Sequence, residues 1–329
     1  MSYCNRLRRT VFGVVVMTVG SVGIVHAQSS VFPTRPITFS VAYTPGSAND
    51  ILVRIVSPDL GKQLGQIIVV DNKPGAGGSI GMASVAKSKP DGYTLGVGST
   101  ATMAVNRALY KNLPYDPLID FTPVIKLAAT PNVLVVPASS PVMNVADLVK
   151  AMGVKRLNYS SPGNGTTQHL AGVLFTKLVG KPAEHIPFKG PAEAVTALLG
   201  GQVDFGFVSL PSALAQIQDG KIRALAVTPL KPTPSMPNVP SLSSAGLDGF
   251  EKTDVWFGMI VPTGTPDAIL QQLHSAAVKT LSNSDVKAKL AAAGYEPAPP
   301  ASATDFSQFV REQVAFWADL VKSSGASVD

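Results

Sequence analysis

The segment Asn158–Phe175 most strongly limits how this chain can fold. It starts as the end of a strand, passes through a turn rich in Ser, Gly and Thr, and continues as an amphipathic helix. A second segment of the same design, Val41–Arg54, lies far earlier in the chain. Each turn predicts free backbone N–H groups and hydroxyls at a helix N-terminus, which bind an anion without a buried cation. The pair predicts a ligand held between two lobes.

Strand and helix patterns alternate along the first part of the chain. The strand patterns Pro36–Ala42 and Gln66–Asp71 flank Ile51–Leu64, whose apolar residues recur at helical spacing. This order predicts right-handed crossovers and a parallel sheet, in which the β-branched run Gln66–Asp71 is a buried parallel strand. Both turns then fall at carboxyl ends of strands, where open α/β sheets bind ligands.

A second strand–helix series runs from the strand Asn132–Pro137 to the strand Ile222–Thr228, with helices predicted over Thr167–Val179 and Pro191–Leu199. It predicts one domain of residues 128–230 and a discontinuous domain of residues 28–127 and 231–329. The Pro-rich stretch Pro229–Pro240 is predicted to be an extended surface connector. The tail returns with the strand Phe257–Val261 and three helices.

The N-terminus has the pattern of a secretory signal peptide. Arg6, Arg8 and Arg9 precede the apolar run Val11–Val25, and Ala27 supplies a small residue before the expected cut. A short membrane anchor is the alternative, although the run is short for a membrane span. Removal of residues 1–27 would lower the net charge from +6 to +3, because three Arg and no acidic residue are lost.

The composition excludes several functional classes. Cys4 is the only cysteine and lies in the predicted signal peptide, so the mature protein would have no disulfide and no cysteine metal site. A secreted, cysteine-free protein of this size is typical of the bacterial periplasm. No basic block is interleaved with aromatic residues, which argues against a nucleic-acid partner. We expect no metal, since the acidic residues form no close pair in a Gly-rich loop. We expect no cofactor, since Ile80 stands where a dinucleotide fingerprint that starts at Gly75 needs its third Gly.

The first turn offers backbone donors and several helix caps. Gly46 supplies an unusual φ, and Ser47, Asn49 or Asp50 can cap the following helix. The functional hypothesis places a carboxylate on the N–H groups of residues 46–49, with Tyr43 as a wall. The alternative is only a well-capped helix.

The second turn combines close backbone approach with hydroxyl donors. Gly163 and Gly165 let the backbone approach a ligand, and the hydroxyl donors are Ser161, Thr166 and Thr167.

Three further residues have two open roles each. His169, on the first helical turn, is either a ligand donor or a structural hydrogen-bonding residue. Lys189 offsets a ligand charge or is a solvated surface lysine. Ala76 contacts the ligand through its backbone or belongs to a tight turn.

Enzyme signatures are scarce. The chain has neither a G-x-S-x-G elbow nor H-E-x-x-H. We expect no catalytic residues. A hydrolase with Ser99 or Ser161 as nucleophile is the alternative from another class, and it would need a nearby base.

Many ordered segments are similar to one known family. They are Tyr43–Asp50, Val69–Gly78, Pro90–Leu95, Tyr115–Pro117, Asp120–Pro123, Asn158–Phe175, His185–Gly190, Leu199–Asp204 and Trp256–Pro266. From about Phe32 nearly to the C-terminus, the chain resembles the Bug-type periplasmic solute receptors of tripartite tricarboxylate transporters.

The resemblance implies an α/β, two-lobed periplasmic binding protein, type II-like. Each lobe would be a mainly parallel sheet flanked by helices, with a hinge and an interlobe cleft. The function implied is capture of a small carboxylate by hinge closure and delivery to an inner-membrane permease, without chemistry. A membrane sensor is the alternative partner, and a monomer is expected. The ligand-binding residues expected from the turns and the resemblance are Tyr43, Thr44, Gly46, Ser47, Ala48, Asn49, Asp50, Ala76, Ser99, Thr100, Ser161, Gly163, Gly165, Thr166, Thr167, His169, Lys189 and Val208.

Two departures from the family pattern bear on the ligand. The first turn usually has Pro-Gly-Gly, whereas this chain has Ser47 at the third position. Val208 stands where the family often has Asp. The missing carboxylate predicts a less polar distal pocket, suited to an aromatic or aliphatic acid.

Overall fold

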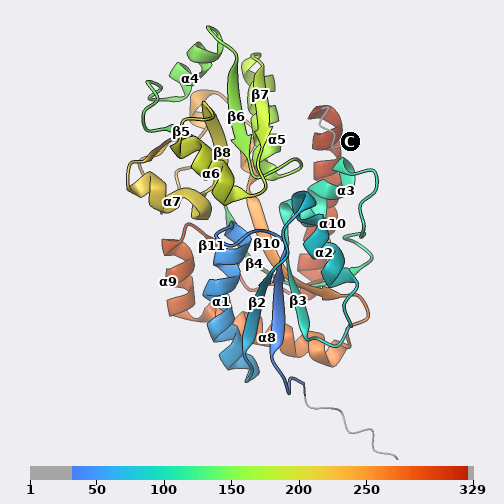
Figure 1. Cartoon of the computed structure of the whole chain (residues 1–329). Coiled ribbons are helices and arrows are strands. Elements are labelled where there is room, and N and C mark those ends of the chain that lie inside the picture. Colours follow the sequence, from blue (N-terminus) through green and yellow to red (C-terminus); the bar gives the residue numbers. More distant parts are fainter. Residues whose placement is uncertain (1–31, 325–329) are drawn as a thin grey trace, which may run out of the picture. The chain divides into compact units, whose positions relative to one another are not determined.

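Two separate sheets, each covered by helices, organise the chain (Figure 1). The computed structural model describes residues 32–324, and for residues 323 and 324 it describes only the backbone. The signal peptide predicted over residues 1–27 lies outside the described residues. Within the described part, no helix is long and apolar enough to cross a membrane.

A six-stranded sheet forms the centre of lobe 1. In spatial order its strands are β11 (Glu296–Pro297), β4 (Phe121–Thr130), β10 (Val255–Pro262), β3 (Thr94–Ser99), β1 (Ile37–Val41) and β2 (Ile68–Asn72). Its helices are α1 (Ala48–Leu64), α2 (Ser79–Ala86), α3 (Asn106–Leu109), α8 (Asp267–Ser282), α9 (Ser284–Ala292) and α10 (Ala303–Ser324). Along β10, Phe257 packs with the α1 and α8 core, and Trp256 packs with the α2 and α10 core. Helices therefore cover both faces of this sheet.

A five-stranded sheet forms the centre of lobe 2. Its strands are β7 (Ala183–Pro187), β6 (Leu157–Ser161), β8 (Phe205–Ser209), β5 (Asn132–Pro137) and β9 (Ile222–Val227). Its helices are α4 (Val145–Met152), α5 (Thr167–Val179), α6 (Pro191–Leu199) and α7 (Leu210–Gln218). Leu134 and Val133, neighbours on β5, belong to the two different cores on either face.

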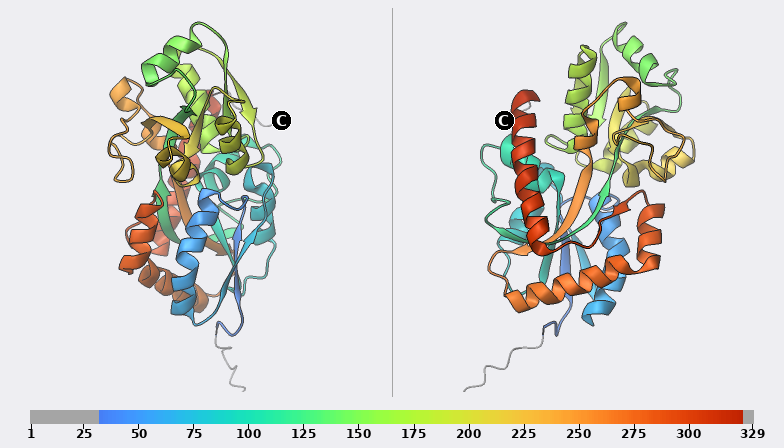
Figure 2. Two further views of the ribbon diagram at one scale, coloured as in Figure 1. Left: turned by 60° about the vertical axis from the view of Figure 1, so that its left-hand side comes forward. Right: turned by 180° about the vertical axis from the view of Figure 1, so that it is seen from behind.

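Both sheets are mixed, so the prediction of mainly parallel sheets is wrong in this detail. β10 runs antiparallel to β3 and β4, and β5 runs antiparallel to β8 and β9. Parallel neighbours need a crossover, usually a helix. β5 and β10 are each entered from the other lobe, through Pro131 and through residues 228–254, so no such crossover fixes their direction. Figure 2 (right) shows these segments passing between the lobes.

Some of the helices and strands predicted from the sequence are confirmed, and others are not. The bounds predicted for Thr167–Val179 and Pro191–Leu199 are confirmed as α5 and α6. β4 and α7 were not predicted. β2 lies at the edge of its sheet, with Val69 48% exposed, so the prediction of a buried strand is wrong. β-branched composition does not distinguish an edge strand from a central strand.

The residues between β9 and β10 pack mainly on lobe 2. Leu242 and Phe250 are buried in the core around Phe207, and Met236 is buried with the opposite core. The Pro-rich stretch is thus partly anchored rather than wholly at the surface. The domain limits near residues 127 and 230 stay predictions.

Candidate functional site

The first turn, between β1 and α1, is held by its own side chains. Ser47 caps α1, because its Oγ accepts the N–H of Asp50 at 3.2 Å. The Asp50 carboxylate accepts the N–H of Gly46 at 2.9 Å and the Nε of Arg54 at 3.0 Å. Burial would raise the pKa of Asp50, but hydrogen bonds from Arg54, Gly46 and Asn72 hold that pKa below its usual value. Asp50 is therefore an anionic clamp on the turn.

The second turn, between β6 and α5, has the same construction. Thr166 caps α5 by accepting the N–H of His169 at 3.3 Å, and its hydroxyl donates to the carbonyl of Gly163 at 2.8 Å. The N–H of Gly165 donates to Nδ1 of His169 at 3.2 Å. Gly163 and Gly165 have φ of +135° and +78°, which favours glycine at both positions.

Both turns meet at a small inner cavity of about 40 Å³. Ser47, Ala48 and Asn49 line it from the first turn, and Thr166 and Gln168 line it from the second. By this measure a water needs about 10–15 Å³. The inner cavity therefore has room for a group of about three heavy atoms, which is the size of a carboxylate.

The inner cavity is rich in unused hydrogen-bond donors. Within residues 32–324, the N–H groups of the lining residues Ala48, Asn49 and Gln168 make no hydrogen bond to the protein. The Nδ2 of Asn49 is buried without a partner, and this residue is 5% exposed. Two helix N-termini add their positive partial charges at the same place. The cavity is thus suited to an anion.

A second, outer cavity of about 550 Å³ adjoins the first and shares Tyr43 and Pro162 with it. Its walls include aromatic and proline side chains and the glycine-rich loop after β2; the residues are Thr44, Pro74, Gly75, Ala76, Gly77, Gly78, Tyr110, Gly163, Asn164, Pro187 and Phe188. Lys189 and Glu193 complete the lining. Glu193 accepts the backbone N–H of Lys189 at 3.2 Å, and the exposed Lys189 is the basic residue among the lining residues.

Tyr43 separates the two cavities as a neutral phenol. Burial raises its pKa, and its hydroxyl donates to the carbonyl of Gly77 at 3.1 Å. The Nδ2 of Asn106 donates to the same carbonyl at 3.0 Å. These bonds fix the glycine-rich loop beside the cavities, where Ala76 has a positive φ of 47°.

The expected ligand residues fall into three sets. Those that line the inner cavity are Tyr43, Ser47, Ala48, Asn49, Ser99 and Thr166. Those that line the outer cavity are Tyr43, Thr44, Ala76, Gly163 and Lys189. Those that line neither are Gly46, Asp50, Thr100, Ser161, Gly165, Thr167, His169 and Val208.

The residues that line neither cavity contact the elements around the site. Thr167 accepts from Asn132 at 3.3 Å, and Thr100 accepts the N–H of Trp256 at 2.9 Å. Val208 packs in a core of lobe 2, 3% exposed. Its side chain therefore points away from both cavities, and the absent carboxylate does not by itself shape them.

Several residues of the inner cavity were not among those predicted from the sequence. Gln168 follows Thr167 in the recognised turn, and Ser209 ends β8, so the rule of strand ends and helix starts could have found both. Val255 and Phe257 come from β10, whose place between β3 and β4 no local pattern indicates.

A serine–histidine pair lies behind the second turn. The Oγ of Ser161 is 2.7 Å from Nε2 of His185, whose ring stacks on His169 with centroids 4.1 Å apart. Burial lowers the pKa of His169 to about 4 and that of His185 to about 3, so both rings are neutral at pH 7. Ser161 is wholly buried and lines neither cavity.

Polar bonds connect the chain segments that pass between the lobes. Thr228 donates to Oδ1 of Asp254 at 2.6 Å and accepts the N–H of Asn132 at 2.9 Å. Burial, reinforced by Glu296 and Glu251, raises the pKa of Asp254 to about 7.

Two α/β lobes joined by crossing strands, with a donor-rich cavity at the strand ends, define a periplasmic binding protein. The sequence of residues 52–326 matches the protein-family model described as the tripartite tricarboxylate transporter family receptor. Protein BugT of Bordetella pertussis (strain Tohama I / ATCC BAA-589 / NCTC 13251) is 32% identical over 97% of each chain. The chain belongs to this receptor family.

Two solved structures carry bound acids. R. palustris Rpa4515 with adipate is 36% identical, with a TM-score of 0.87 over 90% of this chain and 99% of the other. MatC (Rpa3494) from Rhodopseudomonas palustris with bound malate is 32% identical, with a TM-score of 0.83 over 88% and 100%.

Proposed function

We propose that the inner cavity binds one carboxylate of a small organic acid. The observation that carries this proposal is the convergence of unpaired donors from α1 and α5, with the amide of Asn49, on a space of carboxylate size. Such donors replace the water around a carboxylate without a salt bridge. The adipate and malate bound by two similar receptors support this ligand class.

The rest of the ligand lies in the outer cavity. Tyr43, Pro162 and Phe188 give this space an apolar wall, and Lys189 supplies a cation. An aliphatic or aromatic acid suits the wall, and a second carboxylate suits Lys189. Of the expected ligand residues, those that line neither cavity act by holding the turns.

Ligand capture would close the two lobes, and the closed form would deliver the acid to the membrane permease of the transporter or signal to a membrane sensor. The segments around Pro131 and Asp254 would serve as the hinge. The predicted signal peptide would direct export and be cleaved after Ala27, so the monomeric mature protein would work in the periplasm.

The test is a thermal-shift screen of the protein from Gln28 onward against mono-, di-, tri- and aromatic carboxylates. A ligand that binds only the folded form raises the unfolding temperature by mass action. We expect one class of acid to raise it by several degrees. If no acid shifts it, and mass spectrometry finds no acid released from the denatured protein, carboxylate binding is wrong.

The Ser161–His185 pair is the observation in favour of a hydrolase. Within residues 32–324 no carboxylate hydrogen-bonds to His185, and Ser161 has no access to a cavity. A triad needs both. Non-catalytic function is our proposal, and turnover of generic esters that disappears in Ser161→Ala would reverse it.

A further inference from the structure

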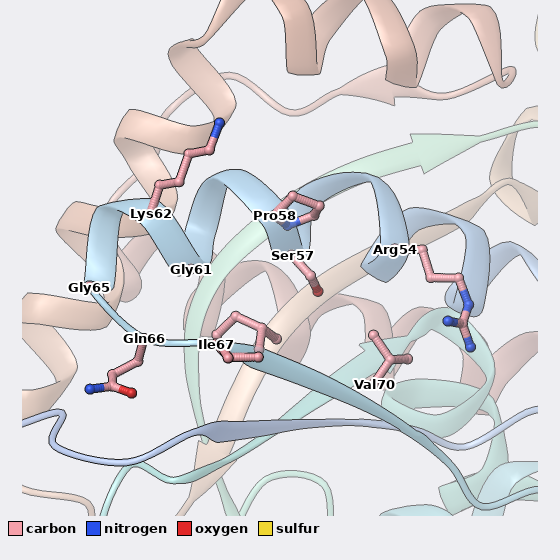
Figure 3. Close-up of a pocket in the computed structure, with 10 residues that line it drawn as sticks. Arg54, Ser57, Pro58, Gly61, Lys62, Gly65, Gln66, Ile67 and Val70 are labelled. Atoms are coloured by element: carbon pink, nitrogen blue, oxygen red, sulfur yellow. The ribbon is translucent and has the colours of Figure 1, made fainter.

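A groove of about 710 Å³ runs along the outer side of lobe 1, between α1 and the edge strand β2 (Figure 3). We call it the edge groove; Arg54, Ser57, Pro58, Lys62, Ile68 and Val70 are among its lining residues. None of its lining residues lines the inner or the outer cavity. The proposed carboxylate site therefore does not account for it.

Among the described residues, nothing pairs with the backbone of β2 on the side away from β1. β2 is the last strand of its sheet, and it pairs with β1 through bonds such as Ile37 N–H to the carbonyl of Ile67 and Lys73 N–H to the carbonyl of Val41. Backbone groups of successive residues alternate in direction along a parallel strand. The N–H and C=O groups of Ile68 and Val70 consequently face the open edge.

The side chains of β2 suit a further strand. Ile68 and Val70 pack against the α1 core, whereas Ile67, which also lines the edge groove, and Val69 are 69% and 48% exposed. A strand added at this edge would place alternate side chains in the edge groove and the others beside Ile67 and Val69. The second set would bury exposed apolar surface.

The α1 side of the groove carries polar groups without partners. The Oγ of Ser57 is buried and has no hydrogen-bond partner in the described part of the chain, the residue is 6% exposed, and Figure 3 shows it directed towards β2. Pro58 has no N–H, so the carbonyl of Arg54 lacks its helical donor. A polar atom that entered the groove would satisfy the Ser57 hydroxyl.

The charge of the groove has one sign. Arg54 and Lys62 line it near its two ends, and among residues 32–324 no Asp or Glu lines it (Figure 3). Arg54 retains an exposed side chain, 53% accessible, although its Nε is bonded to Asp50. An occupant with carboxylates towards the groove would face a cation at each end.

We infer that the edge groove is a docking site for an extended, acidic segment of a partner protein. The segment would extend the sheet at β2, with main-chain bonds to Ile68 and Val70. Its acidic side chains would face Arg54 and Lys62, and its apolar side chains would cover Ile67 and Val69.

Fluorescence anisotropy with a labelled model strand tests this inference. The probe is a peptide of roughly nine residues that alternates Val and Glu, and the control peptide has Lys in place of Glu. We expect the Glu peptide to bind the wild-type protein about tenfold tighter than the Lys peptide at low salt. Methylation of alternate peptide nitrogens should abolish binding, because it removes the main-chain donors.

Val70→Pro and Lys62→Glu locate the binding, with Val70→Thr as the matched control. Val70→Pro removes an outward N–H and no ladder bond, so it should weaken the Glu peptide about tenfold, whereas Val70→Thr should stay within about twofold. Lys62→Glu should reverse the peptide preference. Circular dichroism and the acid-induced thermal shift verify that each variant is folded. If Val70→Pro does not fold, Lys62→Glu and the methylated peptide still test whether the peptide binds at the edge groove.

Three results would overturn the inference. The first is equal binding of the two peptides, and the second is unchanged binding of the Glu peptide by folded Val70→Pro. The third is a concentration-dependent dimer without peptide binding that Val70→Pro dissociates, since the edge would then pair with a second copy of this chain.

Discussion

Thr44 Oγ1 lies 2.6 Å from the position that a Cβ on Gly190 would occupy. Thr44 belongs to the first turn of lobe 1, and Gly190 precedes α6 in lobe 2. The carbonyl of Asn164, in lobe 2, lies similarly 3.2 Å from the Cβ position of Gly77 in lobe 1. The absence of side chains at two glycines thus permits the lobes to approach beside the cavities.

Gly190→Ala should therefore weaken binding of the acid found in the thermal-shift screen by about tenfold. Gly190 has an extended backbone, with φ of 175°, so alanine fits its conformation and only the contact with Thr44 changes. Isothermal titration calorimetry measures the effect. Thr44→Ala in the same chain removes the contacting side-chain atoms and should restore most of the affinity. Wild-type affinity of Gly190→Ala alone would contradict a close approach of Thr44 and Gly190 in the ligand-bound protein.

Asn49→Ala should weaken acid binding by about tenfold, because a hydrogen bond to a charged group contributes about 1.5–3 kcal/mol. Asn49→Asp should weaken it further, since a second carboxylate would then face the ligand. Titration calorimetry compares these variants with Asn112→Ala, a change at an exposed asparagine. Equal affinities of Asn49→Ala and Asn112→Ala would remove the Asn49 amide from the site.

Thr166→Ala should lower both the stability and the affinity. The hydroxyl caps α5 and bonds to Gly163, so its loss should reduce the free energy of unfolding by about 1 kcal/mol. The looser turn should weaken acid binding by about tenfold. Urea unfolding without ligand and calorimetry with ligand separate the two effects. Thr166→Ser keeps the hydroxyl and should behave nearly as wild type; a loss as large as that of the alanine variant would contradict this role.

Lys189→Met should discriminate between ligands that differ in one carboxylate. The ammonium of Lys189 is exposed, so its contribution should be about twofold to fivefold in affinity. We expect this loss for a dicarboxylate and no loss for the monocarboxylate of the same length. Lys231→Met, at another exposed lysine, is the control. An equal loss for both acids would place the second carboxylate elsewhere.

Asp254 should make stability depend on pH. Its pKa is raised to about 7 in the folded protein, above the value of about 3.9 in an unfolded chain. Its contribution to stability is therefore present below about pH 4 and is lost as the pH rises through 7. Asp254→Asn mimics the protonated form and can still accept from Thr228.

Urea unfolding at about pH 5 and pH 8 tests this sign. The stability of Asp254→Asn relative to wild type should be greater at pH 8 than at pH 5. Asp319→Asn, at an exposed position, should show no such difference. A pH-independent difference for Asp254→Asn would show that this carboxylate ionises normally.

Local sequence determines the parts of this protein that were predictable. The start of α5 follows from the cap Thr166, and its end follows from Gly180 in the left-handed conformation. Pro191 at the first turn similarly fixes the start of α6. The two turns and their helix N-termini could be found for the same reason, since caps and glycines act within a few residues.

The remaining features depend on partners distant in sequence. The antiparallel direction of β10 follows from its entry out of lobe 2, and this direction brings Phe257 to the inner cavity. Whether a turn residue faces the ligand or supports the turn depends on which partner takes its polar group. Asp50, for example, is occupied by Arg54 and Asn72 from outside the turn. The spacing of residues in the sequence does not predict which partner a polar group will bind.

The small size of the inner cavity has a kinetic consequence. Its lining residues Ser47, Ala48, Ser99 and Thr166 are all buried. An acid held there could leave only after the two turns separate, so the opening rate would set an upper limit on dissociation. Acids of different affinity would then share the same maximum off-rate. Their off-rates would differ only where dissociation is slower than the opening of the turns.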